Sequence, residues 1–224
     1  MTFLDDASSY TYNQQVAPVT TSCAKASLRR ELLRAREALL PQERALEQQA
    51  VQQQLEALPQ WQQASTICGY AAMGAEVSCD GLLDGALTAG KRVLLPRCVP
   101  GRKLAWHQVD VGWRNRLHIH PYGMGEPDPV RCLLVDPAAL SPQRLLIILP
   151  AVGLDPHTGG RLGYGGGYYD RFLSSLDAEA FTVGIGYKCQ LVALSNLLEP
   201  TDVPLRAVVS SDGCSITPHP KEIS

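Results

Sequence analysis

The chain has 224 residues, a formal net charge of −2, and 45% hydrophobic and 19% charged residues. This is the composition of an ordinary globular protein that can bury one sizeable core. The net charge gives no global reason to expect nucleic acid or an anionic membrane as a partner, and no apolar run approaches the roughly 20 residues of a membrane-spanning helix. The first ten residues, MTFLDDASSY, are acidic and carry no apolar secretory segment, so we expect a cytoplasmic protein.

The N-terminal part of the chain predicts an extension followed by a pair of helices. Residues 1–24 are rich in Ser, Thr and Gln without hydrophobic periodicity, which is typical of a flexible extension. Residues 27–40 carry leucines at helical spacing among basic residues, which predicts a helix. Pro41 interrupts this pattern, and residues 42–58 predict a second, Gln/Glu-rich helix that ends before Pro59.

Short strands then alternate with helices. Strands are predicted at residues 66–71, 92–95, 103–109, 145–149, 182–187 and 207–211, and helices at 80–89 and 168–176. The run at 145–149, LLIIL, is typical of a central strand buried on both faces, whereas residues 110–130 hold much Gly, Pro and His and predict a long loop. The alternation predicts a three-layer α/β/α fold with a mainly parallel sheet, as one domain over 25–214 with a tail at 215–224.

The most informative segment is residues 149–173, LPAVGLDPHTGGRLGYGGGYYDRFL. It joins the expected buried strand to a helix through a glycine-rich turn, and ligand sites of open α/β sheets form beyond the carboxyl ends of strands. Glycines 163 and 165–167 would let backbone N–H groups approach an anion, and Arg161 adds a bidentate cation. Neither GxxxxGK[ST] nor GxGxxG is present. These residues alone therefore leave a phosphate-binding loop and a purely structural turn both open.

Three further charged residues, one in this segment and two at the start of the first predicted helix, also allow two interpretations. Asp170 falls in the first turn of a predicted helix, where it is either a partner of the helix dipole or an oxygen ligand for Mg²⁺. Lys25 and Arg29 are four residues apart on one helical face. They form either a solvated basic surface or a pair that reaches a common phosphate.

A family resemblance rests on the string RLGYGGGYYD at residues 161–170. It resembles the RLGxGxGYYD signature of the 5-formyltetrahydrofolate cyclo-ligase family, also called methenyltetrahydrofolate synthetases. The preceding LPAVGLD resembles that family's strand and turn, with Leu154 where Phe is more usual. The resemblance covers residues 25–212, and the other segments that carry it are KASLR at 25–29, ICGY at 67–70, GAEV at 74–77, GKRVLLP at 90–96, GEP at 125–127, QLV at 190–192 and EPTDVPL at 199–205.

The resemblance implies an enzyme that uses ATP and Mg²⁺ to close 5-formyltetrahydrofolate to 5,10-methenyltetrahydrofolate, with release of ADP and phosphate. It implies phosphorylation of the formyl oxygen followed by attack of N10, with Arg161 and Lys25 as catalytic residues. The residues that it assigns to ATP are Lys25, Ala26, Ser27, Leu28, Arg29, Arg161, Leu162, Gly163, Tyr164, Gly165, Gly166, Gly167, Tyr168 and Tyr169.

The same resemblance assigns folate and metal contacts. Glu76 and Tyr168 are expected to bind the folate, although an exposed loop carboxylate is the alternative for Glu76. Asp170 and Asp202 are expected to hold Mg²⁺, with a turn or cap as the alternative for Asp202. Expected partners are ATP and a reduced folate, with or without a polyglutamate tail, and the protein is expected to be a monomer or a weak homodimer.

Departures from the family pattern keep rival functions open. Thr201 and Arg206 stand where the motif has His and Asp, and Tyr164 and Gly166 stand where some members carry basic residues. One rival is a non-catalytic folate- or nucleotide-binding protein, which would not need the complete phosphate and metal set. A second rival is an ATP-dependent kinase or ligase that acts on another small molecule, and binding of reduced folate would separate it from the first interpretation.

Other residues of chemical interest give weaker signals. The seven cysteines are an odd number without CxxC spacing, which predicts free thiols. His107, His118 and His120 have no carboxylate partner at suitable spacing and are expected to be loop histidines. Trp106 and Trp113 either border the substrate or fill the core.

Overall fold

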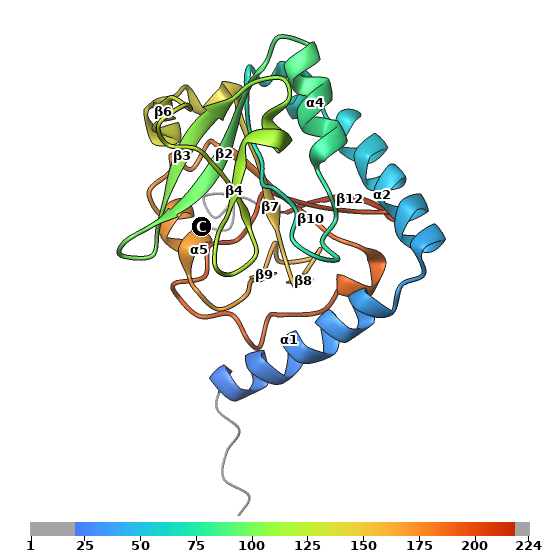
Figure 1. Cartoon of the computed structure of the whole chain (residues 1–224). Helices are drawn as coiled ribbons and strands as arrows, with labels where there is room; N and C mark the ends of the chain where they lie inside the picture. Colours follow the sequence, from blue (N-terminus) through green and yellow to red (C-terminus); the bar gives the residue numbers. More distant parts are fainter. Residues whose placement is uncertain (1–20, 218–224) are drawn as a thin grey trace, which may run out of the picture.

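The structure is a computed structural model that describes residues 21–217 (Figure 1). Residues 1–20 of the predicted extension and residues 218–224 of the predicted tail lie outside this range. The helices are α1 (Thr21–Ala38), α2 (Pro41–Glu56), α3 (Pro59–Gln63), α4 (Asp80–Thr88) and α5 (Tyr168–Leu173). The strands are β1 (Thr66–Cys68), β2 (Arg92–Val99), β3 (Lys103–Val109), β4 (Leu117–Ile119), β5 (Gly125–Pro127), β6 (Leu134–Val135), β7 (Leu145–Pro150), β8 (Gly153–Leu154), β9 (Arg161–Leu162), β10 (Phe181–Ile185), β11 (Ala207–Ser210) and β12 (Gly213–Ile216).

The main sheet is parallel at its centre and antiparallel at its edges. Its strand order is β12-β11-β10-β7-β1-β2-β3-β6. The pairs β1–β2, β1–β7, β7–β10 and β10–β11 are parallel, and β2–β3, β3–β6 and β11–β12 are antiparallel. The predicted mainly parallel sheet is confirmed.

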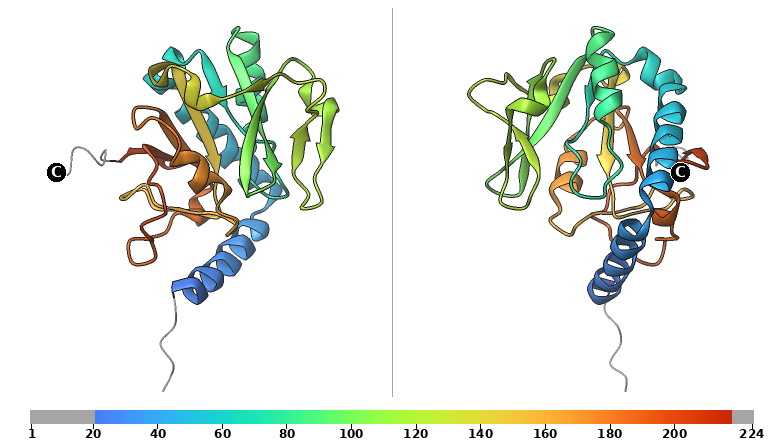
Figure 2. Two further views of the ribbon diagram at one scale, coloured as in Figure 1. Left: turned by 90° about the vertical axis from the view of Figure 1, so that its left-hand side faces the viewer. Right: turned by 45° about the vertical axis from the view of Figure 1, so that its right-hand side comes forward.

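Strand β7 separates the two faces of the sheet. Its side chains alternate, so Leu146 and Ile148 join the core beneath α2, α3 and α4, whereas Ile147 and Leu149 join the core that contains Phe172 of α5. The strand is buried from Leu145 to Leu149, as a strand with neighbours on both edges and layers on both faces must be. The predicted three-layer arrangement is confirmed, with α5 alone on the second face (Figures 1 and 2).

The two N-terminal helices have different positions. Helix α2 packs Val51 and Leu55 into the main core, whereas α1 lies across the carboxyl ends of the strands and buries Leu32 beside Leu162 (Figure 1). Helix α1 begins at Thr21, so the predicted boundary at residue 24 falls inside it. None of the helices in the described part of the chain is long and apolar enough to cross a membrane.

Several predicted boundaries were wrong. Strand β2 continues through Pro96 to Val99, because beyond Leu94 it pairs only with β3 and the missing N–H is tolerated as in an edge strand. Residue 215, where the tail was predicted to begin, lies inside β12, and this strand pairs with β11. The segment predicted as a long loop at 110–130 contains the β4–β5 ribbon, whose three-residue strands are too short to give a periodic pattern.

Candidate functional site

A cavity of about 1190 Å³ lies among the start of α1, the segment after β1, the β2–β3 hairpin, the glycine-rich segment and the turn before β11. It brings together most of the predicted site residues, which come from opposite ends of the sequence. Those lining it are Lys25, Arg29, Glu76, Arg161, Leu162, Gly163, Tyr164, Gly165, Gly166, Gly167, Tyr168, Tyr169, Asp170 and Asp202. Ala26, Ser27 and Leu28 do not line it, since Ala26 and Ser27 are exposed and Leu28 packs beside the Leu32 cluster.

The glycine-rich segment needs its glycines for both conformation and space. Gly165 has φ +96° and Gly167 has φ +67°, a region that other L-residues rarely adopt. A Cβ on Gly163 would lie 2.7 Å from the guanidinium of Arg161, and one on Gly167 would lie 2.8 Å from that of Arg171. The segment therefore leaves β9 and enters α5 with two arginines packed directly against its backbone.

Arg161 is buried at the base of this segment. Its Nη2 donates to Asp170 at 3.2 Å from Oδ1 and 3.3 Å from Oδ2, and its guanidinium lies 5.3 Å from the ring centre of Tyr169. The Nε–H is buried and has no hydrogen-bond partner among the described residues. Within residues 21–217, Arg36, Arg44 and Arg206 have the same unpaired Nε–H, so this feature is not specific to the site, but a guanidinium that lines the cavity is a suitable donor for an anion.

The basic residues of α1 reach the same cavity. Lys25 is buried, and its Nζ lies 2.8 Å from Oε2 of Glu199 and 2.7 Å from Oδ2 of Asp202. Burial by itself lowers the pKa of Lys25, but the hydrogen bonds to Asp202 and Glu199 outweigh it, so the pKa is raised. Arg29 donates from Nε to the carbonyl of Gly163 at 2.7 Å. A solvated basic surface is therefore the wrong interpretation of the pair.

Glu76 lies on the opposite side of the cavity. Its side chain is buried, which excludes an exposed loop carboxylate. Oε2 accepts from the Met73 N–H at 2.7 Å and Oε1 accepts from the Tyr164 hydroxyl at 2.8 Å. Burial raises the pKa of Glu76, while these two hydrogen bonds and the charge of Arg36 oppose the rise.

Tyr164 connects the two sides. Its hydroxyl accepts from Nη2 of Arg36 at 2.9 Å and donates to Glu76. Burial and the neighbouring Glu76 carboxylate raise the pKa of Tyr164 to about 12, so the hydroxyl keeps its proton near neutral pH. The resemblance assigned Tyr164 to ATP, and in the structure its hydroxyl is bound to the side chain predicted for folate.

Three charged residues at or beside the cavity have no role in the sequence-based prediction. Glu199 shares Lys25 with Asp202, and Glu126 is buried with Oε1 accepting from the Cys98 N–H at 2.8 Å. Arg36 is buried beside the cavity. Arg36 has a signal in the sequence, because it continues the i, i+4 series of Leu28 and Leu32 on the apolar face of α1.

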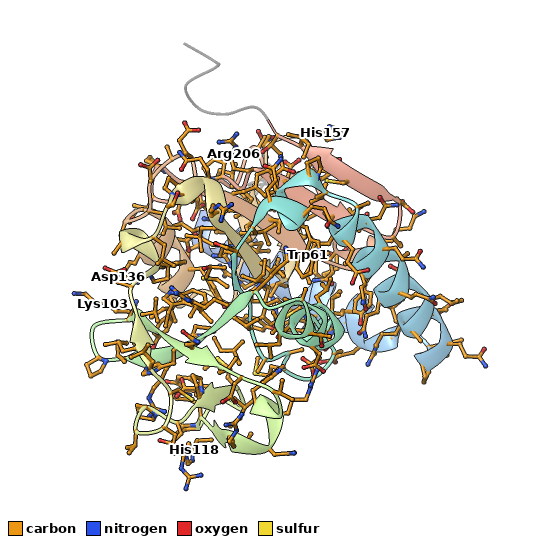
Figure 3. All side chains as sticks on the ribbon, turned by 90° about the horizontal axis from the view of Figure 1, so that it is seen from above. Trp61, Lys103, His118, Asp136, His157 and Arg206 are labelled. Atoms are coloured by element: carbon orange, nitrogen blue, oxygen red, sulfur yellow. The ribbon has the colours of Figure 1, made fainter. Side chains whose placement is uncertain are left out.

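The remaining candidates, three histidines and two tryptophans, do not line the cavity. The expectation of loop histidines without a carboxylate partner was wrong for two of the three. His107 is buried in β3 with Nδ1 3.1 Å from the carbonyl of Cys132, and His118 lies in β4 of the outer β4–β5 ribbon with Nε2 3.5 Å from Oδ2 of Asp128 (Figure 3). Trp106 packs on Phe172 with 4.8 Å between ring centres, and the Nε1 of Trp113 donates to Asp84. Neither tryptophan lines the cavity, so both fill the core. None of the seven cysteines, all of which lie within residues 21–217, forms a disulfide bond.

The carboxylates fit a magnesium ion that arrives with phosphates. Within residues 21–217, no group of three or more His, Cys, Asp and Glu could hold a metal ion alone. Asp170 and Asp202 nevertheless both line the cavity, each bound to one of the predicted phosphate-binding cations. Protein sites usually hold Mg²⁺ through one or two carboxylates plus phosphate oxygens, and this donor set matches that pattern.

Comparison with known proteins identifies the family. Residues 21–211 match the 5-formyltetrahydrofolate cyclo-ligase family. The chain is 32% identical to the 5-formyltetrahydrofolate cyclo-ligase of Escherichia coli K12, with 78% of this chain and 93% of that protein covered. It is 31% identical to the enzyme of Mycolicibacterium smegmatis, with 78% and 91% covered.

A solved structure, that of the 5,10-methenyltetrahydrofolate synthetase of Aquifex aeolicus, superposes with a TM-score of 0.68 at 26% identity. The match covers 86% of this chain and 92% of that chain. The family expected from the RLGYGGGYYD string is confirmed. The chain belongs to the 5-formyltetrahydrofolate cyclo-ligase family, whose members are ligases.

Proposed function

We propose that this chain converts 5-formyltetrahydrofolate to 5,10-methenyltetrahydrofolate at the expense of ATP, with release of ADP and phosphate. The observation that carries the proposal is that one cavity holds both required sets of groups. Lys25, Arg29 and Arg161 supply cations and donors for phosphates, and the buried Glu76 supplies an acceptor for ring N–H groups of a pterin. The cavity of about 1190 Å³ has room for two substrates side by side.

The chemistry requires activation of a poor electrophile. Resonance protects the carbonyl of an N-formyl group, and an oxide ion is a prohibitive leaving group. Transfer of the γ-phosphoryl group of ATP to the formyl oxygen makes that oxygen leave as phosphate. N10 of the folate then attacks the formyl carbon and loses its proton, the C–O bond breaks, and the five-membered ring closes.

The protein's contribution is positioning and charge stabilisation. Arg161, with a buried Nε–H that has no partner among the described residues, is placed to stabilise charge on the transferring phosphoryl group. Lys25 reaches the same cavity on a buried stem, and Arg29 holds the Gly163 carbonyl so that the following segment keeps its shape. Backbone N–H groups of the glycine-rich segment add further donors for phosphate oxygens.

Asp170 and Asp202 are the residues that would hold Mg²⁺. When bound, the ion would neutralise charge on the phosphates. Both carboxylates are held in place by cations in the structure, Asp170 by Arg161 and Asp202 by Lys25. Phosphates would compete for those same cations and so release the carboxylates for the ion.

The experiment is an absorbance assay at the methenyl-folate band with purified protein, 5-formyltetrahydrofolate, ATP and Mg²⁺. We expect product only when all three are present. Controls lacking each component separate the proposed ligase from a binding protein. Replacing the folate by other small acceptors tests the rival kinase or ligase. A folded protein that binds folate but forms no product with fresh substrate contradicts the proposal.

A further inference from the structure

Arg36 is a buried cation whose position is not explained by the phosphate side of the cavity. It lies in the last turn of α1 and is 4% exposed. No carboxylate forms an ion pair with it in the described part of the chain. Its Nη1 lies 3.4 Å from the carbonyl of Ala151, its Nε has no partner among the described residues, and its best hydrogen bond runs from Nη2 to the Tyr164 hydroxyl. A buried cation without a counter-ion is costly unless a charge lies close by.

Two hydrogen bonds connect Arg36 through the Tyr164 hydroxyl to Glu76, and the chemistry of the groups fixes which atom donates in each. A guanidinium can only donate, so the Tyr164 oxygen must accept from Arg36. The single hydroxyl proton of Tyr164 is then free to point at Oε1 of Glu76, 2.8 Å away. The other oxygen of Glu76 accepts from the backbone N–H of Met73 at 2.7 Å. Both oxygens of Glu76 therefore accept hydrogen bonds, and donors to both oxygens favour the ionised state.

We propose that Arg36, acting through the Tyr164 hydroxyl, holds Glu76 as an ionised hydrogen-bond acceptor for the ring N–H groups of the folate. Arg36 is thereby a positioning residue for folate, and Tyr164 belongs to the folate side of the cavity. The inference rests on the proposed function. It extends that function by naming the residues that set the charge and orientation of the folate-binding carboxylate, and by assigning them no contact with ATP.

The neighbouring groups agree with this arrangement. The other titratable side chains that interact with Glu76 are Tyr70, Cys79 and Tyr169. Burial raises the pKa of each of them, so all three are neutral between about pH 5 and pH 8. Arg36 is therefore the cation whose charge opposes the effect of burial on the pKa of Glu76.

Two variants interrupt the hydrogen bonds from Arg36 through Tyr164 to Glu76, each at a different residue. A third, matched variant is the control. Tyr164→Phe keeps the ring and removes the hydroxyl, whereas Arg36→Met removes the cation. Arg34→Met removes a cation from the exposed face of the same helix, two residues away. Arg36→Lys is the conservative variant, since an ammonium can still donate one hydrogen bond to Tyr164.

The measurement is the Kd of 5-formyltetrahydrofolate without ATP, by calorimetry, between about pH 5 and pH 8. We expect Tyr164→Phe and Arg36→Met to weaken folate binding about tenfold at neutral pH, the size of one hydrogen bond to a charged group. Arg36→Lys should give an intermediate value and Arg34→Met no change. The KM for ATP should stay within about twofold of the wild-type value in all four variants.

The pH dependence separates positioning from a general structural role. Burial already raises the pKa of Glu76, and losing either the Arg36 charge or the Tyr164 hydrogen bond removes part of the opposition to it. The pKa therefore rises further, and folate affinity is lost at a higher pH on acidification. Titration of the folate itself cancels, because each variant is compared with the wild type at the same pH. In a Glu76→Gln background, Tyr164→Phe should have no further effect on folate binding.

The outcomes are distinguishable. Wild-type affinity and an unshifted pH curve in both Tyr164→Phe and Arg36→Met would overturn the inference. If Arg36→Met does not fold, Tyr164→Phe decides the question alone, because its half-exposed ring is retained. Failure of the wild-type protein to bind 5-formyltetrahydrofolate would overturn the proposed function together with this inference.

Discussion

The two sides of the cavity hold their charged groups in different ways. On the phosphate side, the cations Lys25 and Arg161 are bound to the carboxylates of Glu199, Asp202 and Asp170, all of which are side chains with rotatable stems. On the folate side, the carboxylate of Glu76 is bound to two neutral donors, the backbone N–H of Met73 and the hydroxyl of Tyr164.

This difference indicates two modes of binding. Neutral donors fix Glu76 before the ligand arrives and leave its charge unpaired by a cation, which lowers the entropy lost on binding. The side-chain pairs of the phosphate side can exchange partners, so we expect ATP phosphates to replace the carboxylates around Lys25 and Arg161. The following predictions test that contrast, from the largest expected effect to the smallest.

Arg161→Ala should have the largest effect on turnover. It removes the buried Nε–H and the partner of Asp170, and loss of such a charge-stabilising donor typically lowers kcat about 10²- to 10³-fold. Steady-state assays of methenyl-folate formation measure it. Arg161→Lys keeps the charge without the forked geometry, so its kcat should lie between those of the wild type and Arg161→Ala. Full activity in Arg161→Ala would exclude a catalytic role for this residue.

Asp170→Asn and Asp202→Asn should raise the Mg²⁺ concentration for half-maximal rate by at least about tenfold each, which corresponds to 1.4 kcal/mol of binding free energy. The measurement is a Mg²⁺ titration at saturating ATP and folate. Asp212→Asn is the control, because that carboxylate pairs with Lys188 on the surface. An unchanged Mg²⁺ requirement in both test variants would remove these two residues from the metal site.

Glu76→Gln should weaken folate binding about five- to tenfold while leaving the KM for ATP unchanged, since it removes a charged acceptor from the folate side only. The variant also tests stability. The pKa of Glu76 is raised in the folded state, so the folded protein takes up a proton as the pH falls toward the unfolded value and gains stability there. Relative to Glu76→Gln, the wild-type Tm should rise on acidification. A constant Tm difference would contradict the raised pKa.

Glu199→Gln should have the smallest effect and the opposite direction. Its carboxylate competes with phosphate for Lys25 from a half-exposed position, and an ion pair of that kind is worth about 0–1 kcal/mol. We therefore expect the KM for ATP to fall about twofold, measured with folate saturating. A raised KM would mean that Glu199 assists ATP binding, and the partner-exchange interpretation of the phosphate side would be wrong.

Local patterns predicted much of the fold. The LLIIL run became β7 because an uninterrupted apolar run needs cover on both faces, and Gly90 ends α4 with φ +72° as a helix stop should. Asp80, predicted to cap that helix, lies one residue inside it and binds Arg114 instead. The β4–β5 ribbon and β12 were missed, because such short antiparallel pairs depend on a partner strand rather than on their own composition.

The sequence by itself determined the family and the chemical inventory of the site, because the RLGYGGGYYD string places its glycines, cation and carboxylate within ten consecutive residues. The tertiary structure decided which charges face one another. Lys25 meets Asp202 across 177 positions and Tyr164 meets Glu76 across 88, and nothing in either local segment encodes those contacts. Packing of α1 across the carboxyl ends of the strands creates them, since it carries Lys25, Arg29 and Arg36 to a site assembled by the rest of the fold.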